Sequence, residues 1–265
     1  MSEKIILNFS DGFQIATDEE EHPQLVNYLK DFDSEKNFSD YELACLFQDF
    51  DRDKDLPREI FNLIVSVYKR EILKGNDEAM LRLGALYYIG HGCEQDFTKA
   101  VYYYEMAAER GNEEALENLG YCYYYGRSVR IDYEKAFHYF SLGAFQGRAI
   151  SLYKIGDMYK NGLYVKKNLR EAFKIYKRAY YEGDEDSYGP ILLRLAKAYL
   201  NGEGVEADPK KALKYFQEAE IYLYEMIKNG DDMYFKSLQE AVDSQDLARI
   251  KLSALLDVQE WQYEK

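Results

Sequence analysis

The sequence is poor in cysteine, histidine and proline, and it lacks any long hydrophobic run. Only three Cys, three His and four Pro occur among 265 residues. Three cysteines make no disulfide framework, so we expect a reducing compartment, most simply a cytoplasmic one. No run of about 18 apolar residues occurs, so we expect no membrane-spanning helix. The opening MSEKIILNFSDGF has neither a long apolar core nor a small-residue cleavage site, and we expect no signal peptide.

Basic residues are also scarce relative to acidic ones. The 34 Lys and Arg are outnumbered by 48 Asp and Glu, which gives a formal net charge of −14. Because like charges repel, this excess disfavours nucleic acid and anionic membranes as direct partners. It is compatible with a protein or peptide partner, including a basic one.

Tyrosine is the abundant residue, with 27 copies, and it recurs at a fixed spacing. Residues 87–111, YYIGHGCEQDFTKAVYYYEMAAERG, return 36 residues later as YYYGRSVRIDYEKAFHYFSLGAFQG. Two further copies follow, YKNGLYVKKNLREAFKIYKRAYYEG and YLNGEGVEADPKKALKYFQEAEIYL. Self-similarity at this period is typical of a helical array in which each unit buries its apolar face on its neighbours.

The aligned copies predict two helices in each unit. A column is the set of equivalent positions in the four aligned copies. Helix A has an apolar column, a column of small residues beside it and a tyrosine column one turn further on. Helix B has apolar and small residues at spacings of three, four and seven, which is the pattern of an amphipathic helix. An N-cap residue precedes helix B in each copy. The small column of helix A is Gly84, Gly120, Gly156 and Ala196, and the N-caps are Asp96, Asp132, Asn168 and Asp208.

These columns resemble the Sel1-like repeat, a relative of the tetratricopeptide repeat. The first unit carries the pattern at Leu83, Gly84, Tyr87, Gly90, Gly92, Asp96, Lys99, Ala100, Tyr103, Tyr104, Ala107, Ala108 and Gly111. The resemblance implies an all-α fold, an α-α superhelix in which helix-turn-helix repeats form a solenoid. Ser128 and Tyr164 replace the second loop glycine in units two and three, so those loops should differ locally. Extra residues near 185–189, ahead of Pro190, should distort the start of the fourth helix A.

Four regions follow from this reading. Residues 1–38 form an acidic segment in which KIILNF-SDG-FQIAT favours a small β-hairpin and QLVNYLKDF a short helix. Residues 39–74 form a degenerate helical repeat, and residues 75–222 form the four repeats. Residues 223–265 should supply the capping helices that an array needs to cover its last apolar face.

One stretch, GHGCEQD, has the residue types of a nucleophile with its base or of a metal loop. The equivalents of His91 in the other units are Arg127, Leu163 and Glu203, and those of Cys93 are Val129, Val165 and Val205. Cys93 is therefore expected to pack as a small hydrophobic residue. Asp96 belongs to the N-cap column, and no strand precedes the glycines, which disfavours a phosphate-binding loop.

Two other patterns that could indicate a metal site do not match the spacing that such a site needs. DFDRDKD, residues 49–55, has the acidic spacing of a calcium loop, but its glycine position is Lys54 and its glutamate position is Ile60. His22, His91 and His138 share no metal-ligand spacing. We therefore expect no catalytic residue, no metal and no cofactor, and the chain is not expected to be an enzyme. The acidic run at 18–21 is expected to be a solvated loop that could dock a basic partner.

Binding residues should lie on helix A where the packing columns do not. In tetratricopeptide arrays helix A lines the concave face, and the resemblance implies the same here. Tyr and Arg are the residues that most often anchor interfaces. The candidate partner-binding residues are Arg82, Tyr88, Glu117, Tyr121, Tyr124, Tyr153, Asp157, Lys160 and Lys197.

Two functions remain open at this stage. The first is a non-enzymatic scaffold or adaptor that holds a protein or peptide in a concave helical groove. The alternative is an inhibitor or immunity protein that sequesters a basic toxin or enzyme. The resemblance to Sel1-like proteins of some bacterial toxin systems implies such a role. Strong salt dependence of binding to one basic partner would favour the inhibitor.

Overall fold

The computed structural model describes residues 5–10, 12, 14–17, 38–50, 58–90, 92–127 and 129–263. Within these residues the chain is mostly α-helical, with one small antiparallel sheet, which confirms the predicted fold class. The chain divides into two compact units. Unit 1 is Met1–Cys122 with Arg127–Arg130, and unit 2 is Tyr123–Gly126 with Ile131–Lys265.

Unit 1 begins with the predicted hairpin. Strands β1 (Ile5–Asn8) and β2 (Gln14–Thr17) pair antiparallel, with Leu7 opposite Ile15, and both of these side chains are buried. Helices α2 (Asp40–Phe50) and α3 (Arg58–Leu73) follow. Asp40 joins the three parts, because it accepts hydrogen bonds from Ser10 and forms a 2.8 Å ion pair with Arg70.

The repeats continue unit 1 with α4 (Asp77–Ile89), α5 (Phe97–Ala108) and α6 (Glu113–Tyr125), whose last residues belong to unit 2. Gly84 shows why helix A needs a small residue. A Cβ on Gly84 would lie 2.7 Å from the ring of Tyr104 on α5, closer than packed atoms approach. The predicted small column is therefore the surface on which helix B packs.

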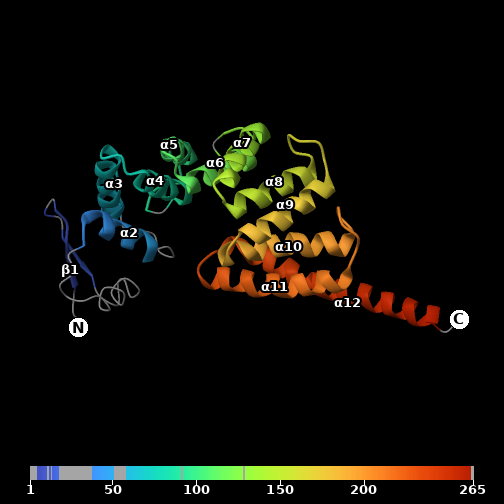
Figure 1. Ribbon diagram of the computed structural model, residues 1–265. Helices are drawn as coiled ribbons and strands as arrows, with labels where there is room; N and C mark the ends of the chain where they lie inside the picture. Colours follow the sequence, from blue (N-terminus) through green and yellow to red (C-terminus); the bar gives the residue numbers. More distant parts are fainter. Residues whose placement is uncertain are drawn as a thin grey trace. The chain divides into compact units, whose positions relative to one another are not determined.

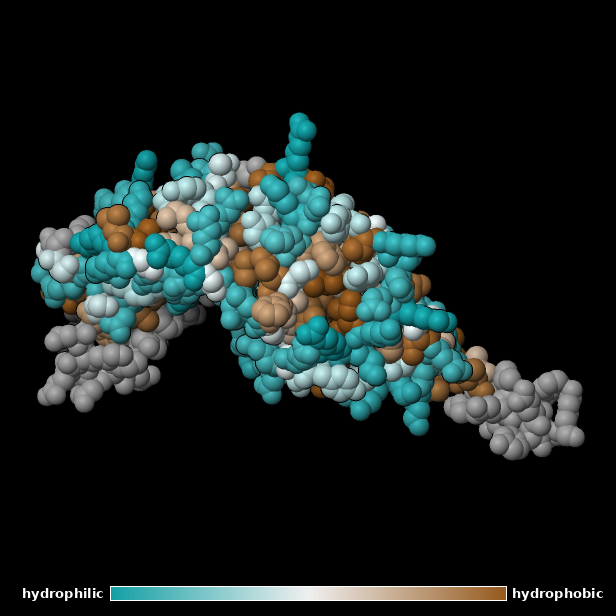
Figure 2. Space-filling model, turned by 45° about the horizontal axis from the view of Figure 1, so that its top comes forward, coloured by the Kyte–Doolittle hydropathy of each residue, from teal (hydrophilic) through white to brown (hydrophobic). Residues whose placement is uncertain are grey.

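Unit 2 contains α7 (Tyr133–Phe145), α8 (Ala149–Asn161), α9 (Leu169–Glu182), α10 (Glu185–Asn201), α11 (Pro209–Lys228), the 3-10 turn η1 (Asp232–Tyr234) and α12 (Phe235–Tyr263). Figure 1 shows α8 with α9 and α10 with α11 as neighbouring pairs. Helix α12 runs back along α11, buries Ala241 and Ala248, and continues past it. Apolar side chains are exposed in the second half of this helix, where Ile250 is 66% and Leu255 47% exposed. Figure 2 shows hydrophobic residues next to the grey atoms.

The predicted N-caps are confirmed. The side chains of Asp96, Asp132, Asn168 and Asp208 each accept a hydrogen bond from the backbone N–H three residues later. In three repeats the residue at that position is a lysine whose ammonium lies over a helix A tyrosine, at 4.9 Å for Lys99 on Tyr87. The other two pairs are Lys135 on Tyr123 and Lys211 on Tyr199.

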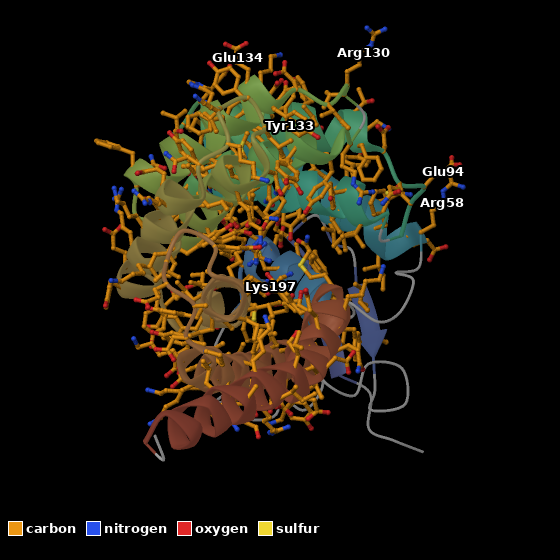
Figure 3. The ribbon with its side chains drawn as sticks, turned by 90° about the vertical axis from the view of Figure 1, so that its right-hand side faces the viewer. Arg58, Glu94, Arg130, Tyr133, Glu134 and Lys197 are labelled. Atoms are coloured by element: carbon orange, nitrogen blue, oxygen red, sulfur yellow. The ribbon has the colours of Figure 1, made fainter. Side chains whose placement is uncertain are left out.

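The third repeat departs from this arrangement because it has Glu171 at the lysine position. Its loop also differs, as predicted. Tyr164 stands where other repeats have the second loop glycine, and it adopts a left-handed φ of 63° that non-glycine residues seldom take. Its hydroxyl lies 3.2 Å from Glu134, which Figure 3 labels at the start of α7.

The fourth repeat corrects one prediction. Its extra residues lengthen the start of helix A instead of interrupting it, since α10 is continuous from Glu185 and contains Pro190. The added turn packs on the end of α11, where a Cβ on Gly189 would lie 2.9 Å from Leu223. Tyr188 meets Tyr222 edge-on at 5.3 Å. With 20 residues, α11 is longer than α5, α7 and α9, so both helices of this repeat have gained length at the end where they meet.

Gly183 differs from the glycines that end helix B in the first two repeats. It ends α9 with φ −83° instead of the left-handed value found at Gly111 and Gly147. Residues 18–37, His91 and residues 51–57 lie outside the described residues. The predicted short helix, the acidic run at 18–21 and most of the stretch DFDRDKD fall there. The four-region division of the chain stays a prediction.

Candidate partner-binding surface

In unit 2, residues of helix A from three repeats meet Tyr176 of α9, a helix B, in a network of aromatic rings and charges. We call it the aromatic–ion cluster, and its members are Tyr124, Tyr125, Tyr153, Lys154, Asp157, Tyr176 and Arg194. They come from the end of α6 and from α8, α9 and α10. Three of them, Tyr124, Tyr153 and Asp157, are among the predicted binding residues.

Lys154 is the centre of one half of the aromatic–ion cluster. Its ammonium lies 5.4 to 5.5 Å from the ring centroids of Tyr124, Tyr125 and Tyr153. It also lies 3.2 Å from the hydroxyl oxygen of Tyr125. A cation over an aromatic face is attracted by the ring quadrupole, more strongly where water is excluded. Lys154 is only 6% exposed, so these contacts fix the three rings around it.

Arg194 is the centre of the other half. Its guanidinium donates to both oxygens of Asp157, at 2.6 Å and 2.5 Å, and lies 4.3 Å over the ring of Tyr153. The Tyr176 hydroxyl donates to the same carboxylate at 2.8 Å. A bidentate, charge-assisted pair of this kind is strong and sets orientation as well as energy.

The charges of the aromatic–ion cluster shift the ionisation of its members. Burial raises the pKa of Asp157, but the positive charge of Arg194 and its hydrogen bonds outweigh this, and the pKa lies below its usual value. Burial, together with the charge of Asp157, raises the pKa of Tyr124 to about 12. At neutral pH the cluster therefore presents a neutral phenol beside a fixed ion pair.

Two further predicted residues, Lys160 and Lys197, form ion pairs. Lys160 on α8 pairs with Glu203 at 2.6 Å. Lys197, labelled on α10 in Figure 3, pairs with Glu240 of α12. The lysine side chains keep 27% and 33% of their surface exposed. These residues give unit 2 an accessible charged surface beside the more buried cluster.

Unit 1 contains the remaining predicted residues. Arg82 forms 3.0 Å ion pairs with Asp49 and Glu78. Tyr88 is half-buried and packs against Phe97 and Tyr104, the neighbouring rings of its own repeat. Tyr121 is half-buried on α6, and Glu117, one turn earlier on the same helix, is only 6% exposed.

Burial separates residues that can touch a partner from residues that can only support the surface. Tyr153 is 2% exposed, so it holds Arg194 and Lys154 in place but offers almost no area of its own. Tyr125, which the sequence did not single out, is 49% exposed. Lys154 and Arg194 are the centres of the aromatic–ion cluster, yet they were not among the predicted binding residues. The repeat alignment could have identified them, because they occupy the same repeat position as Arg82, which was predicted to bind.

The motif that suggested chemistry has a different environment. Burial raises the pKa of the Cys93 thiol, which opposes formation of the thiolate that a nucleophile needs. Asp96 is occupied as the N-cap of α5 and as the ion-pair partner of Lys99. In the part of the chain that the structure describes, no three His, Cys, Asp or Glu side chains are grouped to hold a metal ion. None of the helices described is long and apolar enough to cross a membrane.

Comparison with known proteins places the repeats in one family. The family model of the Sel1 repeat matches residues 77–112, 113–147, 149–184 and 192–220, slightly more than half of the chain. No curated protein matches the chain.

Two solved structures are similar in fold. A Sel1 repeat protein from Oxalobacter formigenes is 24% identical, with a TM-score of 0.57, over 68% of this chain and 76% of that one. The protein c5321, a protective antigen of uropathogenic Escherichia coli with an SLR fold, is 26% identical with a TM-score of 0.55. That match covers 74% of this chain but only 44% of c5321. The immunity protein Pa5087 from Pseudomonas aeruginosa, at 20% identity and a TM-score of 0.37, is too distant to inform function.

Proposed function

The chain belongs to the Sel1 repeat family, and we propose that it is a non-enzymatic scaffold whose helix A surface in unit 2 binds a protein or peptide. Sel1 repeats are in general protein-interaction modules. The observation that carries the proposal is the aromatic–ion cluster. Aromatic residues and arginine held rigidly at a surface are the groups that most often dominate binding energy.

The cluster supports binding because it is organised before a partner arrives. The rings around Lys154 and the carboxylate under Arg194 are already in contact, so little side-chain entropy remains to be lost on association. The buried members, above all Tyr153, hold this arrangement. Tyr125 is the accessible member of the cluster. We propose that it touches the partner together with the partly exposed lysines beside the cluster, Lys160 and Lys197.

The partner chemistry follows from the charges at this surface. Each accessible lysine is paired with a glutamate, Lys160 with Glu203 and Lys197 with Glu240. A partner segment that carries both a basic and an acidic residue beside an apolar one could exchange with these pairs and cover Tyr125. The net charge of −14 further favours partners of positive net charge. A cytosolic location is part of the proposal, supported by Cys45, Cys93 and Cys122, which are all free thiols.

A matched pair of double variants tests the surface. Tyr125→Ala with Lys197→Ala alters the helix A side. Tyr181→Ala with Lys177→Ala removes the same residue types from α9, a helix B, where Lys177 lies 5.8 Å from the Tyr181 ring centroid. Proteins retained by the wild-type chain from its native cells, above a mock bait, are identified, and the affinity of the purified partner is then measured. We expect the first variant to weaken binding about tenfold or more and the second to leave it within about twofold.

Three outcomes would contradict the proposal. The wild-type chain could retain nothing above the mock bait, the helix B variant could be the one that loses affinity, or a purified partner could be chemically transformed. If one basic partner is found and its affinity falls steeply with salt, the inhibitor or immunity role would replace the scaffold role while the surface stands.

A further inference from the structure

A groove between α11 and α12 lies outside the aromatic–ion cluster. It encloses about 410 Å³, and its walls are Glu220, Ile221, Tyr224, Glu225, Leu238, Gln239 and Val242. The two helices are joined by the short turn η1 and run antiparallel, so the groove has two helical walls. An amphipathic helix commonly binds in this kind of site, with its apolar face laid into the groove.

The walls of the groove are apolar where a helix would press against them. Ile221 and Tyr224 on α11 are 63% and 58% exposed, and Val242 on α12 is 40% exposed. Phe235 is one turn before Leu238 on α12 and is 55% exposed. These side chains are distinct from the ones that hold α11 against α12, because Leu223 and Ala241 are fully buried. Of the wall residues, Leu238 also packs against this core, whereas Ile221, Tyr224 and Val242 remain exposed.

The charges at the groove are acidic. Glu220 and Glu225 are among the wall residues, and none of the wall residues that the structure describes is basic. The nearby ionic groups do not reverse this sign. Lys228 pairs with Glu225 at 3.3 Å, and Arg249, one turn past Gln245, pairs with Asp246 at 2.6 Å. Glu220 accepts a 2.6 Å hydrogen bond from the neutral amide of Gln245.

We infer that the groove between α11 and α12 binds an amphipathic helix of a partner protein that carries lysine or arginine beside an apolar stripe. The apolar stripe would cover Ile221, Tyr224 and Val242, and the basic residues would face Glu220 and Glu225. A second copy of this chain is a poorer occupant, because two chains of net charge −14 repel each other. None of the wall residues named above belongs to the proposed helix A surface.

The probe is a fluorescent Leu–Lys peptide of about 15 residues with heptad spacing, since shorter helices are marginal in water. A Leu–Glu peptide of the same pattern and a scrambled Leu–Lys peptide of the same charge serve as controls. Binding to the full chain is followed by fluorescence anisotropy. We expect the patterned basic peptide to bind about tenfold more tightly than either control, because affinity needs both the charge and the apolar face.

Two groove variants and one outside variant locate the binding. Ile221→Lys with Val242→Lys should weaken the basic peptide about tenfold or more, and Glu220→Gln with Glu225→Gln should weaken it and flatten its salt dependence. Tyr181→Ala, on α9, should leave the affinity unchanged within about twofold. The altered groove side chains are polar or at least 40% exposed, and an unchanged circular dichroism spectrum checks that each variant folds.

Several results would overturn the inference. If the scrambled peptide binds as well as the patterned one, or if both groove variants bind at wild-type affinity, the contact is general attraction to an acidic surface. If no basic peptide binds, the groove has no such ligand. If sedimentation shows a dimer that Ile221→Lys with Val242→Lys dissociates, a second copy is the occupant.

Discussion

Removing Arg194 should destabilise unit 2 far more than removing an ordinary surface arginine. The guanidinium is 23% exposed and its partner Asp157 is 14% exposed, so both charges are largely out of water. In the variant Arg194→Met, Asp157 keeps the Tyr176 hydroxyl but loses a bidentate partner. Methionine preserves much of the side-chain volume, and the change therefore reports mainly on charge.

The magnitude follows from burial. Breaking a buried ion pair by removing one partner costs about 3–5 kcal/mol. Asp157 stays close to Lys154 and to the Tyr176 hydroxyl, so we expect the lower end, about 3 kcal/mol. For a unit of this size that corresponds to a loss of about 6–12 °C in melting temperature. Arg178→Met is the matched control. Its pair with Glu182 has side chains 57% and 41% exposed, and such pairs are worth about 0.5 kcal/mol.

The assay is thermal and urea unfolding followed by circular dichroism. If units 1 and 2 unfold in separate transitions, each transition is analysed by itself. A double variant tests whether the cost comes from the carboxylate left without its partner. Asp157→Asn with Arg194→Met should be more stable than Arg194→Met alone, because the uncompensated carboxylate is gone while the amide oxygen still accepts from Tyr176. The reasoning is refuted if Arg194→Met melts within about 1 °C of Arg178→Met, or if the double variant is the least stable of the three.

Two further predictions concern the same part of the molecule. Gly156→Ala should lower the free energy of unfolding in urea by roughly 1–3 kcal/mol. The new Cβ would lie 2.5 Å from the Tyr176 ring, which Asp157 holds in place. A free energy of unfolding equal to wild type would show that helices α8 and α9 move apart freely. The pH dependence of stability should change in Asp157→Asn. The folded pKa of Asp157 is below the ordinary value of 3.8, so its contribution is present above that value and is lost as the pH falls below it. The variant should therefore lose less melting temperature than wild type between about pH 5 and pH 3, and an identical loss would exclude a role for this carboxylate.

The repeat columns were sufficient to predict the fold because each column reports a contact inside one repeat. The N-cap at Asp96 and the close approach of Gly84 to Tyr104 both join residues that are at most 20 apart in sequence. Local spacing and side-chain size determine such contacts. The same columns identified Cys93 as a packing residue, and the raised pKa of its thiol agrees with that prediction.

The aromatic–ion cluster was only partly predictable, because its contacts join different repeats. Arg194 meets Asp157 from 37 residues away, and Lys154 meets the Tyr125 hydroxyl from 29 residues away. A column shows which residues share a helix face, but it does not show which side chains reach across to the next helix. For that reason the sequence placed Tyr153 at the binding surface, while in the structure its ring lies beneath Arg194.

The fourth repeat has a consequence for how freely such repeats can be exchanged. Its added turn on α10 lies against the added end of α11, with Gly189 facing Leu223 and Tyr188 facing Tyr222. Transplanting only one of these helices into a repeat of ordinary length would leave a turn with no surface to pack on. We therefore expect an insertion at this end of a repeat to be tolerated only when both of its helices lengthen together.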